Sequence, residues 1–413
     1  MELLNIKEIN YIAKACSYSN VIDWTLEELQ DKIIGYLGDH LNLIIEVESN
    51  GIKTELRLFV KCMPRFDIWK ANYIKELYFF EKEYIMLSKL FKEFENREDS
   101  HKWRPRLLFI KENLFVFENV SLQGYKMPHN QDTMTLEELQ ASVHTLGRFH
   151  AQTFIFEERK SKELGRPYRI WEEYSEYLQE PLNTTVWRDT GRNAVMDYLK
   201  VFSKYKSMPN FSRHLELIIP GLYDKAIELM NPSTEYRNVV VHRDLWTNNI
   251  FLKKGPNADY HCMFVDFQTV VYCSPMLDLS SLIYFNTSRM NRDTWTSELI
   301  DSYYNVLSQE LKANGLNIEG IMDKSTIKDA YEKSILFSIT QAGLITPIVA
   351  MSKDKREEIF CNTETTKRVN TVSRSEEFIM IAREDNKYHT RVTELFDEIV
   401  ERFVFPKDTG KEL

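Results

Sequence analysis

The sequence predicts an α+β fold with a β-rich first part and a larger, mainly helical second part. Residues 30–62 alternate apolar and polar side chains with the period of a strand, whereas the chain beyond residue 135 is dominated by helical spacing. Two short apolar segments, residues 239–252 and 263–268, interrupt the helical part and carry polar clusters. With 413 residues, the chain is long enough for two or three packed units.

Composition limits the kinds of partner. The formal net charge of −9 argues against sequence-independent binding to nucleic acid, which needs a basic face. Five scattered cysteines without C-x-x-C spacing indicate neither a disulfide framework nor a zinc site. The first 20 residues contain no apolar core of the signal-peptide type, and the most apolar window, residues 335–351, is too short to span a membrane. We therefore expect a cytoplasmic protein.

The first 62 residues predict a helix followed by a strand hairpin. Residues 5–16 have the apolar spacing of an amphipathic helix. Residues 41–47 alternate apolar and polar side chains, and Ser49-Asn50-Gly51 is a typical hairpin turn. The second strand then ends in Phe59-Val60-Lys61.

Four residues of this region are candidate nucleotide-binding residues. Gly35 and Gly38 precede the hairpin, where glycines let backbone amides approach a phosphate, although a plain turn explains two glycines about as well. Strand alternation places Phe59 and Lys61 on the same face. There Lys61 would hold phosphate groups and Phe59 would lie over a nucleotide base, whereas a solvated lysine at a strand end is the plain alternative.

A helical pattern over residues 71–92 supplies a partner for the lysine. Glu83 borders the apolar stripe of this pattern. An ion pair with Glu83 would fix the Lys61 ammonium near the phosphates. Glu76 and Glu81 are rival candidates, and solvation of all three carboxylates is the simplest alternative.

The chain then predicts a crossing between two domains. Residues 106–117 contain two strands around a turn, and the second strand runs into Glu118 and Val120. The backbone at Glu118 and Val120 would bond to an adenine ring, a contact that depends little on side-chain identity. We accordingly predict a nucleotide-binding domain over residues 1–119 and a catalytic, substrate-binding domain over residues 120–413.

Helical signals dominate the remainder. Thr135 and Glu138 form a capping-box pair that opens a helix extending to about residue 157. Residues 167–230 carry helical segments rich in aromatic side chains, which suit a core and a wide apolar pocket equally. Asp278 is expected to be the N-cap of a helix over residues 279–285. Later helices are predicted over residues 294–313, 327–343 and 374–403.

The two polar clusters predict phosphoryl transfer. H-x-D-x-x-x-x-N, from His242 to Asn249, followed 17 residues later by apolar-apolar-D-F at Asp266, is a pattern of that chemistry. In it, Asp244 accepts the proton of an acceptor hydroxyl, and Asn249 and Asp266 bind Mg²⁺. The plain alternative is that these three polar residues only punctuate turns.

On these motifs the chain resembles the ecdysteroid kinase-like family, within the choline and aminoglycoside kinase superfamily. The resemblance covers residues 35 to about 290. It implies a protein-kinase-like two-lobed fold, ATP and Mg²⁺, and phosphorylation of a hydroxyl of a small-molecule alcohol, characteristically an ecdysteroid. The family usually has glycine where this chain has Arg243. The motifs that carry the resemblance are Gly35–His40, Phe59–Lys61, Phe117–Val120, Leu146–Ala151, His242–Asn249 and Val265–Gln268.

Three alternatives stay open: a protein kinase, a choline- or aminoglycoside-type kinase, and an inactive pseudokinase that binds a hydrophobic ligand. Trp246, Gln268 and the lack of an A-P-E motif argue against the protein kinase. A steroid-sized alcohol needs a broad apolar wall, whereas a cationic substrate needs acidic and aromatic groups together. The aromatic residues predicted to form such a wall are Trp171, Tyr174, Tyr177, Trp246, Tyr284, Phe285 and Phe337.

Overall fold

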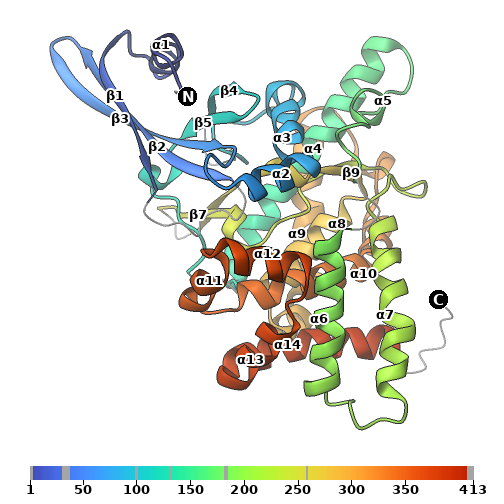
Figure 1. Ribbon diagram of the computed structural model, residues 1–413. Helices are drawn as coiled ribbons and strands as arrows, with labels where there is room; N and C mark the ends of the chain where they lie inside the picture. Colours follow the sequence, from blue (N-terminus) through green and yellow to red (C-terminus); the bar gives the residue numbers. More distant parts are fainter. Residues whose placement is uncertain are drawn as a thin grey trace. The chain divides into compact units, whose positions relative to one another are not determined.

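The computed structural model describes residues 3–29, 38–97, 101–129, 133–180, 185–256 and 259–406. The chain forms two compact units, and it passes between them more than once (Figure 1). The first unit contains Met1–Met127 and Asn248–Thr269, and the second contains Pro128–Thr247 and Val270–Leu413. The sequence predicts a different division, with nucleotide binding in residues 1–119 and catalysis in residues 120–413. This functional division stays a prediction.

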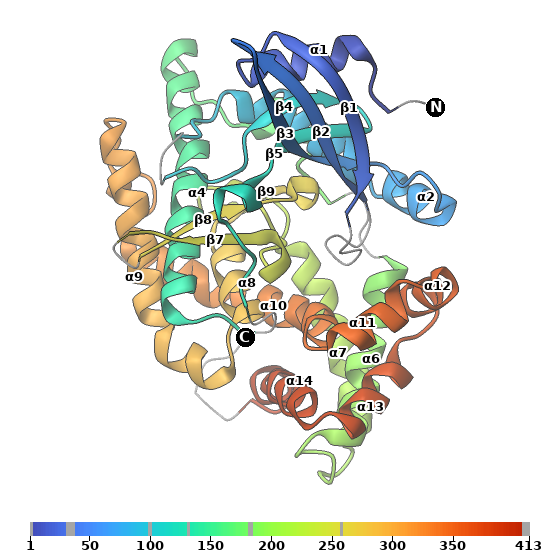
Figure 2. The same ribbon diagram turned by 90° about the vertical axis from the view of Figure 1, so that its left-hand side faces the viewer.

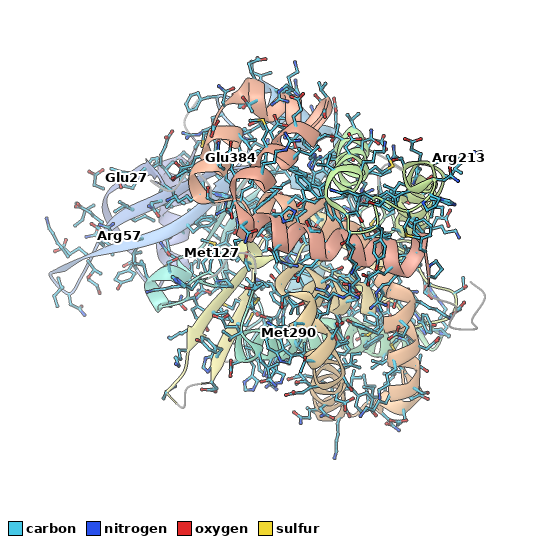
Figure 3. All side chains as sticks on the ribbon, turned by 90° about the horizontal axis from the view of Figure 1, so that it is seen from below. Glu27, Arg57, Met127, Arg213, Met290 and Glu384 are labelled. Carbon is cyan, nitrogen blue, oxygen red and sulfur yellow. The ribbon has the colours of Figure 1, made fainter. Side chains whose placement is uncertain are left out.

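The first unit is built on an antiparallel sheet of five strands in the order β1-β2-β3-β5-β4. Apolar residues of α1, β2 and β3 form its core. Figure 3 labels two exposed side chains of this sheet, Glu27 on the edge strand β1 and Arg57 on the central strand β3. The strands and first helix are α1 (Ile6–Ala15), β1 (Asn20–Glu28), β2 (Asp39–Ser49), β3 (Ile52–Cys62), β4 (Leu107–Lys111) and β5 (Leu114–Glu118).

The turn between β2 and β3 follows from its sequence. Asn50 and Gly51 have φ angles of 53° and 78°, and two successive residues with positive φ make the tight turn that matches the twist of a hairpin. Ser49 pairs with Ile52 directly across it. The predicted hairpin and the predicted helix over residues 5–16 are both confirmed.

The predicted helix over residues 71–92 is instead two helices and a 3₁₀ turn. They are α2 (Ile68–Glu76), α3 (Phe79–Ser88) and η1 (Leu90–Lys92). The break falls at Tyr78, whose φ of 57° is incompatible with a continuing right-handed helix. The apolar spacing continues across the break, which is why periodicity alone did not detect it.

A second, short hairpin completes the first unit. β7 (Ile250–Lys254) pairs antiparallel with β8 (Tyr260–Phe264). The 3₁₀ turn η3 (Thr247–Asn249) leads into β7, and the 3₁₀ turn η4 (Phe267–Thr269) follows β8. Lys126 and Leu252 exchange backbone hydrogen bonds of 2.9 and 2.7 Å, which tie the hairpin to the chain after β5.

The second unit is mainly helical. α4 and α9 pack side by side (Figure 2), and α8 is buried along its whole length. β6 (Val239–Val241) and β9 (Val271–Cys273) form a short antiparallel pair. The helices are α4 (Leu136–Leu164), α5 (Trp171–Tyr174), α6 (Val186–Phe202), α7 (Phe211–Glu228), α8 (Met276–Asn286), α9 (Arg289–Ala313), α10 (Lys324–Val349), α11 (Lys353–Phe360), α12 (Thr363–Thr371), α13 (Ser375–Glu384) and α14 (Asn386–Ile399), with a π-helical turn at Val400–Val404.

The predicted α+β class, with a β-rich first part and a helical second part, is confirmed. The capping box of Thr135 and Glu138 opens α4 as predicted. Two more features differ from the sequence-based expectations. β1 was not predicted, because as an edge strand it buries no residue fully and lacks a clean alternation. The helix expected over residues 374–403 is broken at Asp385, which caps α14.

Among the described residues, no single helix is long and apolar enough to cross a membrane. One helix pair, Lys324–Val349 with Lys353–Phe360, passes that test together but is bent by 97°.

Candidate functional site

Lys61 is the centre of a buried polar cluster in the first unit. Its Nζ lies 2.5 Å from Oε2 of Glu83, 2.6 Å from Oδ1 of Asp266 and 3.2 Å from Oε1 of Gln268. The alternation of β3 explains its position, because Leu58, Val60 and Cys62 face the apolar core while Lys61 points to the opposite face. One ammonium group is therefore held by three oxygen atoms from α3 and from the segment after β8.

Glu83 joins the lysine to the backbone of the Asp-Phe segment. While Oε2 accepts from Lys61, Oε1 accepts from the backbone N–H of Phe267 at 3.1 Å. The Phe267 ring packs edge-on against Phe91 and Trp103, with centroid distances of 5.2 and 5.5 Å. The glutamate thus fixes the lysine and the turn that carries Asp266 at the same time.

The charges of this cluster do not balance. It contains one ammonium group and the two carboxylates of Glu83 and Asp266. Burial opposes the charge of Lys61, but the Asp266 and Glu83 carboxylates outweigh it and raise the pKa of the ammonium. Burial raises the pKa of the Glu83 carboxyl, and the negative charge of Asp266 adds to that shift. The Lys61 side chain is 7 % exposed and that of Asp266 is 25 % exposed, so the excess negative charge lies where an ion could reach it.

Asn249 and Asp266 lie at the same end of the β7–β8 hairpin. Asn249 directly precedes Ile250, which pairs with Phe264, and the N–H of Val265 donates to the Asn249 carbonyl at 3.1 Å. Asp266 then adopts a φ of 69°, a left-handed conformation that asparagine and aspartate tolerate better than most residues. The hairpin register therefore places side by side the two chain segments that carry Asn249 and Asp266, the residues that the sequence predicts as metal ligands.

The residues present fit a magnesium ion. Mg²⁺ prefers oxygen ligands and is usually bound in proteins by one or two carboxylates, with waters and substrate phosphates as the other ligands. Asp266 offers a partly exposed carboxylate with excess negative charge nearby. The side-chain oxygen of Asn248 is buried and has no hydrogen-bond partner among the described residues. Those residues contain no group of three or more His, Cys, Asp and Glu side chains placed to hold a metal ion alone, so such an ion would depend on ligands beyond these side chains.

In the sequence, Gln268 is only part of a motif that the chain shares with the family. The structure shows which side chains it contacts. Its Nε2 donates to Oδ2 of Asp266 at 3.2 Å while its Oε1 accepts from Lys61. The amide therefore spans the Lys61–Asp266 ion pair. The sequence does not predict this role, because a glutamine does not imply a partner 207 positions away.

The predicted nucleotide-binding residues are placed as follows. Gly38 lies beside the lysine, since a Cβ added there would be 3.7 Å from Cε of Lys61. Phe59 packs on His40, with ring centroids 5.2 Å apart. Gly35 lies outside the described residues.

The chain after β5 holds Glu118 and Val120. The Glu118 carboxylate accepts from the backbone N–H of Arg106 at 2.6 Å and from Gln123 at 2.8 Å, and it pairs with Lys102. The backbone N–H of Glu118 donates to the Arg106 carbonyl, and the Val120 carbonyl accepts from Tyr125. Adenine contacts at these two residues stay a prediction.

In the second unit, the loop that carries Asp244 is held by a buried carboxylate. The backbone N–H groups of His242 and Arg243 each donate to Asp278 at 2.6 Å. Asp278 also contacts the His150 ring at 3.1 Å, and it is fully buried. The predicted N-cap role of Asp278 was wrong, because α8 begins at Met276 and Asp278 lies within its first turn.

The loop is further shaped by His242 and Arg243. The N–H of Asp244 donates to Nδ1 of His242 at 3.3 Å. Arg243 has a φ of 74°, yet its side chain is only 8 % exposed. It pairs with Glu180, and its Nη1 lies 3.4 Å from Sδ of Met230. Burial lowers the pKa of Arg243 to about 10, and Asp244 opposes the shift.

The aromatic residues predicted to line a wide pocket do not gather at one surface. Tyr284 and Phe285 are buried on α8, where the Tyr284 hydroxyl donates to Glu398. Trp171 stacks on Tyr272. Phe337 does line a hollow, between α6, α7 and α10.

Comparison with known proteins identifies the family. The ecdysteroid kinase-like family model matches residues 33–316, and the chain belongs to this family. The five-stranded sheet and the larger helical part agree with the α+β class that the resemblance to this family implies. No curated protein matches the chain.

Solved structures show distant likeness. The Plasmodium vivax ethanolamine kinase is 12 % identical, with 95 % of this chain and 84 % of that chain covered and a TM-score of 0.37. The GDP and kanamycin complex of APH(2'')-IIia is 12 % identical, with 92 % and 99 % covered and a TM-score of 0.38. The microcompartment-associated aminopropanol kinase is 14 % identical, with 82 % and 99 % covered and a TM-score of 0.32. With TM-scores below 0.5, these likenesses carry no inference about the substrate of this chain.

Proposed function

We propose that this chain is an ATP-dependent phosphotransferase that phosphorylates a hydroxyl group of a small molecule. The observation that carries the proposal is the Lys61 cluster. A buried ammonium held by Glu83 and by Asp266 is the arrangement that a kinase needs in order to bind phosphates beside a metal ligand. Membership of the ecdysteroid kinase-like family supports the same activity.

The residues divide the work as follows. Lys61 binds phosphate oxygens, and Glu83 keeps its ammonium in place. Asn249 and Asp266 would hold Mg²⁺, which supplies positive charge to the phosphates when bound. Asp244 orients the acceptor hydroxyl and accepts its proton, while His242 and Asp278 hold the backbone on which Asp244 lies.

We further propose nucleotide contacts at Gly35, Gly38, Phe59, Glu118 and Val120. Gly38 is supported by its place beside Lys61, and Phe59 by its place on the same strand face. We also propose a cytoplasmic setting. All five cysteines lie in the described residues and are free, as is usual in a reducing compartment.

The proposed acceptor is a bulky, uncharged alcohol such as an ecdysteroid. The family's name supports a steroid. A choline- or aminoglycoside-type kinase and an inactive pseudokinase are the competing functions.

One experiment separates these functions. ATP consumption by the purified protein is measured with a polyhydroxylated steroid, choline and an aminoglycoside at equal concentration. We expect turnover with the steroid and little with either cation. Preference for a cation would establish the choline- or aminoglycoside-type reaction, and ATP binding without turnover on any alcohol would establish the pseudokinase.

A further inference from the structure

Asn286, the last residue of α8, contacts the segment that follows Asp244. Its Nδ2 donates to the backbone carbonyl of Leu245 at 2.8 Å, and also at 2.8 Å to the carbonyl of Leu282, one turn earlier in α8. Asn286 is only 1 % exposed. Because Leu245 directly follows Asp244, α8 holds the loop after Asp244 as well as before it, where Asp278 lies.

The chemistry of these two contacts fixes the orientation of the Asn286 amide. Both partners are carbonyl oxygens, which only accept hydrogen bonds, so the NH₂ group and not the oxygen of the amide must face them. The amide oxygen is buried and has no hydrogen-bond partner among the described residues. A buried acceptor without a partner is unfavourable, and an apolar residue of similar size would avoid it. The two donated bonds are therefore what the asparagine contributes at this position.

Helix α8 is a rigid support for this contact. All of its residues are buried, it packs against α4 and α10, and Ser280 bonds to Ser338 of α10. The backbone carbonyl of Asn286 accepts from the N–H of Met134 at 2.8 Å, so the main chain of this residue is held as well as its side chain. A loop that is attached to such a helix at two places keeps a fixed position relative to it.

The loop between the two attachments contains a strained residue. Arg243 has a φ of 74°, and a residue with a Cβ keeps such a conformation only where its surroundings hold it. The N–H groups of His242 and Arg243 bond to Asp278 in the first turn of α8, and the carbonyl of Leu245 bonds to Asn286 at its end. At ~1.5 Å per residue these two anchors lie ~12 Å apart along the helix axis. The pair therefore fixes the direction of the loop as well as its position.

We propose that Asn286 is a positioning residue for Asp244, the proposed base. Its bond to the Leu245 carbonyl fixes the chain after Asp244, as Asp278 fixes the chain before it. A base acts only within hydrogen-bond reach of the proton that it accepts, and a displacement of about 1 Å can lower turnover by ~10²-fold. The inference rests on the proposed phosphotransferase function for its meaning in catalysis, but the attachment of the loop does not depend on turnover.

The substitution Asn286→Thr separates this role from that of a helix cap. A threonine hydroxyl can still donate to the Leu282 carbonyl four residues earlier, as Thr287 does to the Ile283 carbonyl at 2.6 Å. The hydroxyl has a single hydrogen to donate, so the Leu245 carbonyl loses its donor. Asn286→Ser provides the same comparison if Asn286→Thr does not fold, which circular dichroism decides.

The first measurement does not require turnover. Amide hydrogen exchange is followed by mass spectrometry in a peptide that spans residues 242–248. We expect exchange there to be about tenfold faster in Asn286→Thr than in the wild type, because the loop opens more often once one anchor is lost. Ser280→Ala is the matched control, since it removes a buried hydroxyl of α8 that bonds to the Met276 carbonyl and not to the loop. Exchange in the same peptide should not change in this control.

The second measurement tests whether Asn286 acts through Asp244. The kcat and the KM for ATP are measured with whichever of a polyhydroxylated steroid, choline and an aminoglycoside the wild type turns over fastest. We expect Asn286→Thr to lower kcat by ~10–100-fold with an unchanged KM for ATP. In an Asp244→Asn background, the same substitution should lower kcat by less than about twofold, because the base that it positions is already absent.

The outcomes distinguish this inference from the proposed function. Unchanged exchange in Asn286→Thr would overturn the attachment, whatever the turnover. Equal losses of kcat with and without Asp244, or a raised KM for ATP without a loss of kcat, would overturn the positioning of the base. Faster exchange in Asn286→Thr, together with a wild type that turns over none of the alcohols, would reject the phosphotransferase and the catalytic role of Asn286 but retain the attachment of the loop.

Discussion

The Lys61 cluster of the first unit and the Asp278 cluster of the second both bury charged side chains, but they bond to different kinds of group. The partners of Lys61 are side-chain oxygens from Glu83, Asp266 and Gln268. The carboxylate of Asp278 instead accepts from two backbone N–H groups, those of His242 and Arg243. Asp266 is partly exposed, whereas Asp278 is fully buried.

This difference indicates different duties. Side-chain ion pairs can exchange a partner for an incoming phosphate or cation without a change of the main chain. A carboxylate that satisfies buried backbone donors cannot be released without leaving those donors unpaired, at a cost of ~1–3 kcal/mol for each group. We infer that the first cluster is suited to bind ligands and the second to hold a loop rigid.

The largest effect is expected from Asp278→Ala. The change leaves two buried N–H groups and the His150 ring without their acceptor, and breaking such a buried charged network costs ~3–5 kcal/mol. Urea denaturation should show this loss in the free energy of unfolding. Asp278→Asn keeps one acceptor oxygen and should lose less. A stability near wild type for Asp278→Ala would show that the loop does not depend on this carboxylate.

Asp266→Asn should lower turnover without unfolding the protein. The amide keeps the shape of the side chain but removes the charge proposed for Mg²⁺, so we expect turnover to fall by ~10²–10³-fold with an unchanged circular dichroism spectrum. Asp259→Asn, the same substitution at the far end of the β7–β8 hairpin, is the matched control. Normal turnover by folded Asp266→Asn would rule out the metal role.

Lys61→Met and Asp244→Asn should separate the two duties of phosphate binding and proton acceptance. Asp244→Asn should lower the chemical step by ~100-fold and leave ATP affinity nearly unchanged. Lys61→Met should weaken ATP binding, turnover or both. Calorimetric titration with ATP decides between them, and loss of ATP binding in Asp244→Asn alone would reverse the two assignments.

The smallest effect concerns pH. Burial raises the pKa of Glu83 above its usual value of 4.5. A carboxyl with a raised pKa in the folded state contributes stability that is complete below pH 4.5 and is lost as pH rises through the folded-state pKa. Across pH 4.5 to 8, the unfolding free energy of the wild type should therefore fall relative to that of Glu83→Gln, whose amide does not titrate. A wild type that gained stability relative to Glu83→Gln with rising pH would contradict a raised pKa of Glu83.

Local chemistry explains which features the sequence predicted. Asn50-Gly51 implies one turn type, Thr135 and Glu138 satisfy each other's backbone groups, and alternation alone turns Lys61 away from the apolar core. Each signal acts within a few residues. The family motifs added Asn249 and Asp266 as a pair, and the register of the β7–β8 hairpin brings them together.

The missed features depend on distant partners or on single backbone angles. Asp278 looks like a helix cap, and only the fold reveals its bonds to residues 35 and 36 positions earlier. The break at Tyr78 has no glycine or proline to mark it. The aromatic residues of the second part are equally compatible with a core and with a pocket. Of the seven predicted for a pocket wall, the structure buries Tyr284, Phe285 and Phe337 and leaves the other four partly exposed.

The discontinuity of the first unit has a consequence for synthesis on the ribosome. Lys61 and Glu83 are 22 residues apart and can pair early, whereas Asp266 is 205 residues from Lys61. At translation rates of ~5–20 residues per second, the nascent first unit waits about 7–28 s after residue 127 before its last segment, which ends at residue 269, is made. During this interval Lys61 has only one of its two ionic partners. Slow or paused translation of the intervening helices would prolong the time for which the first unit lacks its last hairpin and is exposed to aggregation.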